Sequence, residues 1–168
     1  MCLPFRPAAL VALSILLASP PSASFAAATI MTTSVGAAVI SECSISAGSV
    51  AFGNYDPLGA NATSNLDVSG GITVACTKGA PNVTISLDNG SHFAAPNRQM
   101  SRSGSSDLLQ YQLYADSSRT TVWNTSNKVA YTSTSAAPQR IPIYGRIFAG
   151  QDVSTGSYSD SVIATVNF

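Results

Sequence analysis

The chain has 168 residues, carries eight Lys and Arg against eight Asp and Glu, and is only 10% charged. No cluster of basic residues is present, so the electrostatic footprint of nucleic-acid binding is missing, and no basic amphipathic helix indicates a membrane surface as partner. The polar side chains are mostly Ser, Thr, Asn and Gln, a composition common in extracellular β-proteins.

The first residues follow the order of a secretory signal peptide. One basic residue, Arg6, precedes an apolar run from Ala8 to Ala18, and small residues follow as far as Ala28. The apolar run has roughly half of the ~20 residues that a membrane-spanning helix needs, which disfavours the alternative of an uncleaved membrane anchor. We therefore expect residues 1–28 to be a signal peptide, with cleavage after Ala26 or after Ala28.

An alternating stretch from Thr29 to Ile40 follows, with no charge before Glu42. Its odd positions are Met31, Thr33, Val35, Ala37 and Val39. Such alternation is typical of a β-strand. Two interpretations fit the pattern equally: the stretch is the first strand of the chain's own fold, or it is a strand offered to another molecule.

Removal of the signal peptide, which contains Cys2, leaves two cysteines, Cys43 and Cys76. An exported chain enters an oxidising compartment, where an even number of cysteines predicts a disulfide. The alternative is a pair of buried free thiols. A metal site is not favoured, because only one histidine, His92, is present to join them.

The remaining chain is predicted to form short strands. Alternating apolar sets are Ile72, Val74 and Cys76; Val83, Ile85 and Leu87; Leu109, Tyr111 and Leu113; Ile141, Ile143, Gly145 and Ile147; and Val162, Ala164, Val166 and Phe168. Asp88-Asn89-Gly90 is a strong turn signal, because Asn and Gly tolerate positive φ. Pro142 predicts that its strand lies at a sheet edge. Short strands with frequent turns indicate one domain, a β-sandwich or barrel.

The residue types that catalysis requires are sparse. His92, the only histidine, comes just after the Asn89-Gly90 turn and is expected to be a solvated loop residue. The carboxylates are scattered singly, with no pair placed for acid/base chemistry. No phosphate-binding glycine loop and no cluster of metal ligands is present. The sequence therefore predicts no enzyme, cofactor or metal ion.

Several segments together resemble the spore coat protein U domain, which is also the subunit of archaic chaperone–usher pili in Gram-negative bacteria. They are the run Tyr111–Thr120 with Trp123, the run Ile141–Ile147, the ending Gly156–Phe168, and the Cys43/Cys76 pair with Phe52–Tyr55. Each motif alone is modest, but their order and spacing cover nearly all of the mature chain and make the combination specific.

The resemblance implies an all-β fold: an incomplete immunoglobulin-like β-sandwich that lacks its final strand and is completed by donor-strand complementation. Residues 41–168 are then the sandwich, and residues 29–40 are a donor-strand extension. The odd positions named above, Met31 to Val39, are expected to enter the groove of a neighbouring subunit, although the segment Ala37–Ile40 has the alternative of starting the chain's own first strand. Val162, Ala164, Val166 and Phe168 are expected to line the chain's own acceptor groove.

The resemblance also implies partners and a location. The expected partners are other pilin subunits, a periplasmic chaperone and an outer-membrane usher, with the Phe168 carboxylate anchoring basic chaperone residues. The expected location is a cell-surface pilus, or fimbrium, reached through the periplasm and supporting adhesion and biofilm formation. Two alternatives keep the same fold: a secreted spore coat or matrix protein, and a pilus-tip adhesin that binds a surface or glycan.

Overall fold

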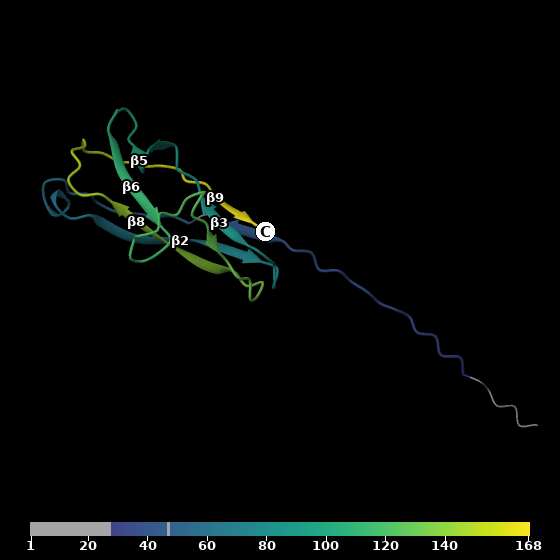
Figure 1. Ribbon diagram of the computed structural model, residues 1–168. Helices are drawn as coiled ribbons and strands as arrows, with labels where there is room; N and C mark the ends of the chain where they lie inside the picture. Colours follow the sequence, from purple (N-terminus) through teal and green to yellow (C-terminus); the bar gives the residue numbers. More distant parts are fainter. Residues whose placement is uncertain (1–27, 47) are drawn as a thin grey trace, which may run out of the picture. The chain divides into compact units, whose positions relative to one another are not determined.

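Two antiparallel β-sheets make up the regular structure of the chain (Figure 1), in a computed structural model that describes residues 28–46 and 48–168. The predicted signal peptide lies outside the described residues except for Ala28. The chain divides after Ala37, and the compact unit Ala38–Phe168 contains every strand of the described residues. The predicted all-β class is confirmed.

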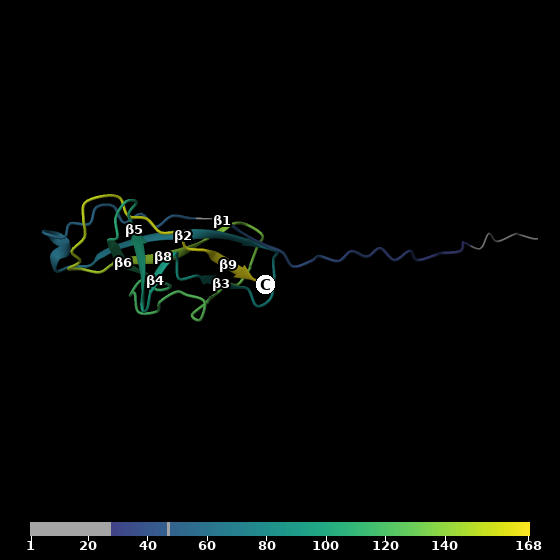
Figure 2. The same cartoon turned by 90° about the horizontal axis from the view of Figure 1, so that it is seen from above.

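The larger sheet has the strand order β1 (Cys43–Ser46), β2 (Leu66–Cys76), β8 (Gln139–Ile147), β6 (Leu108–Tyr114), β5 (Asn97–Ser101) and β4 (His92–Ala94). The smaller sheet has the order β7 (Val129–Ala130), β3 (Thr84–Leu87) and β9 (Ala164–Asn167). All pairings are antiparallel. Figure 2 shows β3 and β9 alongside each other near the C-terminus. A short 3-10 helix, Ala60–Ala62, lies between β1 and β2.

The core is built from the faces that alternation predicted. Its buried members include Ile72, Val74 and Cys76 of β2, Ile85 and Leu87 of β3, Leu109, Tyr111 and Leu113 of β6, and Ile143 and Ile147 of β8. Trp123 is fully buried among them, and its indole N–H donates to the Ile85 carbonyl at 3.0 Å. Because side chains alternate between the two faces of a strand, one apolar face per strand is sufficient to fill the space between the sheets.

The predicted edge position of the strand around Pro142 is wrong. Strand β8 lies between β2 and β6, and Pro142 is paired with Gly71 of β2. The pairing of β8 with β6 covers only Tyr144 to Ile147. At Pro142, β8 therefore has a neighbour on one side only, and the missing N–H is tolerated at a locally open position of a central strand.

The predicted disulfide is present between Cys43 and Cys76. The two residues face each other in the β1–β2 ladder, so the bond clamps the first residue of β1 to the last residue of β2. Strand β1 is four residues long and, among the residues that the structure describes, pairs with β2 alone. The disulfide consequently holds in place a strand that has few other attachments.

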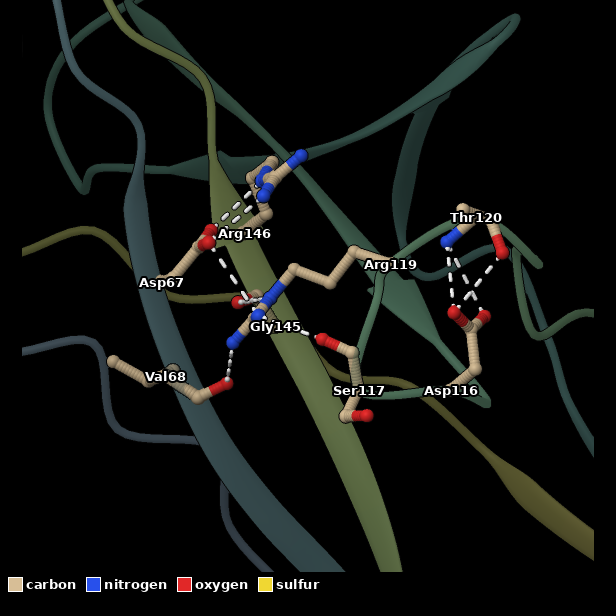
Figure 3. A network of polar contacts seen from close by, with 8 residues as sticks. All are labelled: Asp67, Val68, Asp116, Ser117, Arg119, Thr120, Gly145 and Arg146. Atoms are coloured by element: carbon tan, nitrogen blue, oxygen red, sulfur yellow. Dashed lines mark hydrogen bonds and ion pairs between the residues drawn. The ribbon is translucent and has the colours of Figure 1, made fainter.

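A polar network fixes the loop after β6 against two adjacent strands of the larger sheet, β2 and β8 (Figure 3). The Arg119 side chain donates to the Gly145 carbonyl at 3.2 Å and to the Val68 carbonyl at 3.1 Å. Arg146 forms a bidentate pair with Asp67, at 2.7 and 2.8 Å. Because Arg119 satisfies main-chain carbonyls of both β2 and β8, it joins the loop to both strands at once.

Candidate functional site

Four strands, β1, β4, β7 and β9, lie at the edges of the two sheets within the described residues, and two of them, β1 and β9, lie next to each other. Strand β1 ends one side of the larger sheet and β9 ends one side of the smaller sheet, and each has a single strand partner within the described residues. An open edge presents a row of unpaired N–H and C=O groups, which makes it a template for another strand.

A groove of about 620 Å³ lies beside these two edges. One wall comes from β1 and the segment after it, and the other from the start of β9 and the segment before it. The lining residues are mainly apolar: Ile45, Val50, Phe52, Ile72, Leu87, Met100, Tyr111, Leu113, Ile143, Tyr158, Val162, Ile163 and Ala164 line it, together with Gly48, Ser49, Ser159 and Asp160. The groove therefore combines exposed apolar surface with open strand edges.

The first wall lies close to the larger sheet because Gly145 has no side chain. A Cβ atom at Gly145 would lie 2.7 Å from the Phe52 ring and 2.8 Å from Val50. Phe52 in turn packs edge-on against Tyr111, with ring centroids 6.0 Å apart. Beyond Phe52 and Tyr158 a second cavity, of about 520 Å³, continues along the same walls.

The second wall, residues 158–163, is held by main-chain and side-chain hydrogen bonds. Ser159 exchanges two main-chain hydrogen bonds with Ser101, at 2.9 and 3.0 Å. The Asp160 side chain is 2% exposed and accepts hydrogen bonds from the Tyr111 hydroxyl at 2.6 Å and the Ser91 N–H at 2.9 Å. Burial, together with the hydrogen bond to Asp160, raises the pKa of Tyr111 well above its ordinary value. Tyr111 therefore stays a neutral donor to this carboxylate.

The structure brings two of the four predicted acceptor residues to the groove. Val162 and Ala164 line it. Val166 is half-buried and packs on the core next to it, while Phe168 is 55% exposed at the end of the chain. Sequence reasoning missed Phe52 as a wall residue, and the signal available for it was the resemblance of Phe52–Tyr55 to a family motif.

The predicted donor residues lie in a stretch, residues 28–42, that has no secondary structure. Met31 is 87% exposed, Val35 95% and Val39 85%, and the smaller Thr33 and Ala37 are exposed as well. The chain's own first strand starts at Cys43, so the alternative start within residues 37–40 is not observed. Their role as donors remains a prediction.

Reactive groups are not concentrated at the groove. His92 is the first residue of β4 rather than a loop residue, its side chain is 44% exposed, and its Nδ1 atom lies 4.0 Å from Asp160. Within residues 28–46 and 48–168, no group of three or more His, Cys, Asp or Glu side chains is placed to hold a metal ion. The same residues contain no helix of the length and apolarity needed to cross a membrane.

The sequence is similar to one family of known proteins. A family model described as the Spore Coat Protein U domain matches residues 29–165. Protein U of Myxococcus xanthus is 34% identical over 139 residues, which are 75% of this chain and 77% of that protein.

Among solved structures, the fold is similar to a chain in the crystal structure of the CsuC–CsuE chaperone–tip adhesion subunit pre-assembly complex from archaic chaperone–usher Csu pili of Acinetobacter baumannii. The TM-score is 0.55 at 23% identity, over 77% of this chain. This likeness confirms the predicted immunoglobulin-like, pilin-type sandwich as the fold class. The present chain spans only 40% of the matched chain.

Proposed function

Because the chain belongs to the Spore Coat Protein U domain family, we propose that it is a structural subunit of a secreted archaic chaperone–usher pilus and that it polymerises by donor-strand exchange. The observation that carries the proposal is the apolar groove beside the open edges of β1 and β9. The function is structural rather than enzymatic, because the site offers strand edges and apolar surface.

In this proposal residues 29–40 of one subunit add as a strand to the groove of the next. Strand addition takes its affinity from main-chain hydrogen bonds and its specificity from alternate side chains. Met31, Val35 and Val39 are the large odd-position side chains, and burying each contributes about 1.5–3 kcal/mol. Thr33 and Ala37 bury less apolar surface, so main-chain pairing, at about 0.5–1.5 kcal/mol per hydrogen bond, carries more of the interface.

The same groove explains the need for assembly partners. An apolar groove with unpaired edges makes an isolated subunit prone to aggregation. A periplasmic chaperone fills the groove during transport, and an outer-membrane usher exchanges the chaperone for the next subunit. The exposed Phe168 carboxylate is the group that basic chaperone residues bind. Residues 1–28 direct export, residues 41–168 form the sandwich, and the assembled pilus supports adhesion and biofilm formation at the cell surface.

The test is expression of the whole chain in a Gram-negative periplasm with its chaperone and usher, followed by unheated detergent gels. We expect ladders of polymer for the wild-type chain. Val35→Asp should abolish them, because its side chain enters the groove, whereas Ser34→Asp adds the same charge on the other face of the strand and should preserve them. Equal ladders from both variants, or a wild-type chain that is a stable monomer without chaperone, would contradict the proposal.

The description of the matched family favours a second candidate, a secreted spore coat or matrix protein. It predicts a self-contained subunit that needs no chaperone. A third candidate is a pilus-tip adhesin, because the matched solved structure is a complex of a chaperone with a tip adhesion subunit. Chaperone dependence in the same experiment separates the coat protein from both pilus roles.

A further inference from the structure

The groove wall on the β9 side is longer than β9 itself. The ladder between β3 and β9 ends at the pair Leu87 and Ala164. Residues 158–163 precede it without strand assignment, yet five of the groove-lining positions, Tyr158, Ser159, Asp160, Val162 and Ile163, belong to this segment. Interactions other than the hydrogen bonds of a regular ladder therefore fix the position of these residues.

Asp88 extends the β3–β9 ladder by one further pair, with Ile163, and uses its side chain as one of the two hydrogen-bonding partners. Its N–H donates to the Ile163 carbonyl at 2.9 Å, as the next ladder pair requires. The Asp88 carbonyl, however, accepts from the buried Arg98 guanidinium, with the Nε contact at 3.0 Å. The Asp88 carboxylate replaces that carbonyl and accepts the Ile163 N–H at 2.9 Å.

Asp160 acts in the same way further along the wall. Its carboxylate accepts the N–H groups of Ser161 at 2.8 Å and Ser91 at 2.9 Å, near the positions where a ladder would pair the two segments. The hydrogen bond from Tyr111 ties this carboxylate to β6. The Ser159–Ser101 pair then closes the segment against β5.

The alternation of an antiparallel strand fixes where the remaining main-chain groups point. Ser159 bonds to β5 and Ile163 bonds toward β3, so the N–H and C=O groups of the even residues face the opposite direction, toward the groove. Within the described residues, the main-chain groups of Asp160 and Val162 make no hydrogen bond. They are therefore in position to pair with an incoming strand.

We propose that Asp88 and Asp160 are positioning residues that extend the strand-accepting edge of the groove from Ala164 back to Asp160. The inference rests on the proposed function and specifies which backbone an incoming strand pairs with: the even residues from Asp160 to Val166. A donor segment of twelve residues, about 40 Å at ~3.3 Å per residue, is far longer than four-residue β9 and gains from the longer edge.

The test is residue-resolved hydrogen–deuterium exchange on polymer assembled from the mature chain. In wild-type polymer we expect the Val162 amide to be protected to a similar degree as Ala164 and Val166. In Asp160→Ala polymer, protection of Val162 should fall at least about ten-fold while that of Ala164 and Val166 is unchanged. Asp160→Asn, which keeps an acceptor oxygen, should restore it, and Asp152→Ala, an exposed carboxylate, should have no effect.

The outcomes separate this inference from the proposed function. A Val162 amide that exchanges freely in wild-type polymer while Ala164 is protected overturns the inference and leaves donor-strand exchange standing. Unchanged protection of Val162 in Asp160→Ala, or an equal loss from Val162 to Val166, also overturns it, because Asp160 would then have no effect or a purely structural one. Absence of polymer in the wild type overturns the proposed function instead. If Asp160→Ala fails to assemble, the protection of the Val162 amide relative to Ala164 in wild-type polymer still tests the inference.

Discussion

Loss of the Cys43–Cys76 disulfide should destabilise the subunit through its unfolded state. The two cysteines are 33 residues apart. In the chain-entropy model, opening a loop of that length costs about 3.7 kcal/mol at 25 °C. A domain of this size is stable by about 5–15 kcal/mol, so the double variant Cys43→Ser/Cys76→Ser should lose a large part of its free energy of unfolding. The wall of the groove formed by β1 should be the first region to loosen.

Urea unfolding of the purified mature chain, with its groove filled by a synthetic peptide of residues 29–40, measures this loss. Trp123 is the only tryptophan and is fully buried, so its fluorescence reports unfolding of the core. With a urea dependence of about 1–3 kcal/mol per molar, the midpoint should fall by roughly 1–4 M. Reductant should move the wild-type curve to that of the variant and leave the variant unchanged. A loss below about 1 kcal/mol, or a variant that still responds to reductant, would refute the reasoning.

Two further predictions concern single side chains. The hydrogen bond from Arg146 lowers the pKa of Asp67, so this carboxylate stabilises the fold above its unfolded pKa of about 4, and the contribution disappears as pH falls through the lowered pKa. Asp67→Asn should therefore weaken the dependence of the urea midpoint on pH below about pH 4. An unchanged pH dependence in this variant would argue against a stabilising Asp67–Arg146 pair. Gly90 and Gly104 have φ of 78° and 77°, but an added Cβ collides with the Asp160 carboxylate only at Gly90. Gly90→Ala should therefore lower the unfolding free energy by more than the roughly 1 kcal/mol expected for Gly104→Ala, and equal losses would contradict the close contact.

The fold class and most of the core could be predicted from the amino-acid sequence. Side-chain period is a local property, so the alternating sets around Val74, Ile85 and Leu113 identify buried strand faces without knowledge of strand partners. The disulfide could be predicted as well, because an exported chain with two cysteines is expected to pair them whatever its fold. The resemblance of whole segments to one family supplied the expectation of an open groove, which periodicity alone did not contain.

The residues that form the groove walls could not be predicted from local sequence patterns, because they come from distant segments that the packing of the sheets brings together. Phe52 and Tyr158 lie far apart in the sequence, and nothing in either local pattern indicates that both lie beside one opening. Strand order is equally non-local, which is why Pro142 predicted an edge strand although β8 is central. Asp88 lies in the predicted Asp88-Asn89-Gly90 turn, and the local sequence around Asp160 carries no signal of a structural role. Their function as hydrogen-bond acceptors follows from contacts between segments 69 and 75 residues apart, set by how the sheets pack.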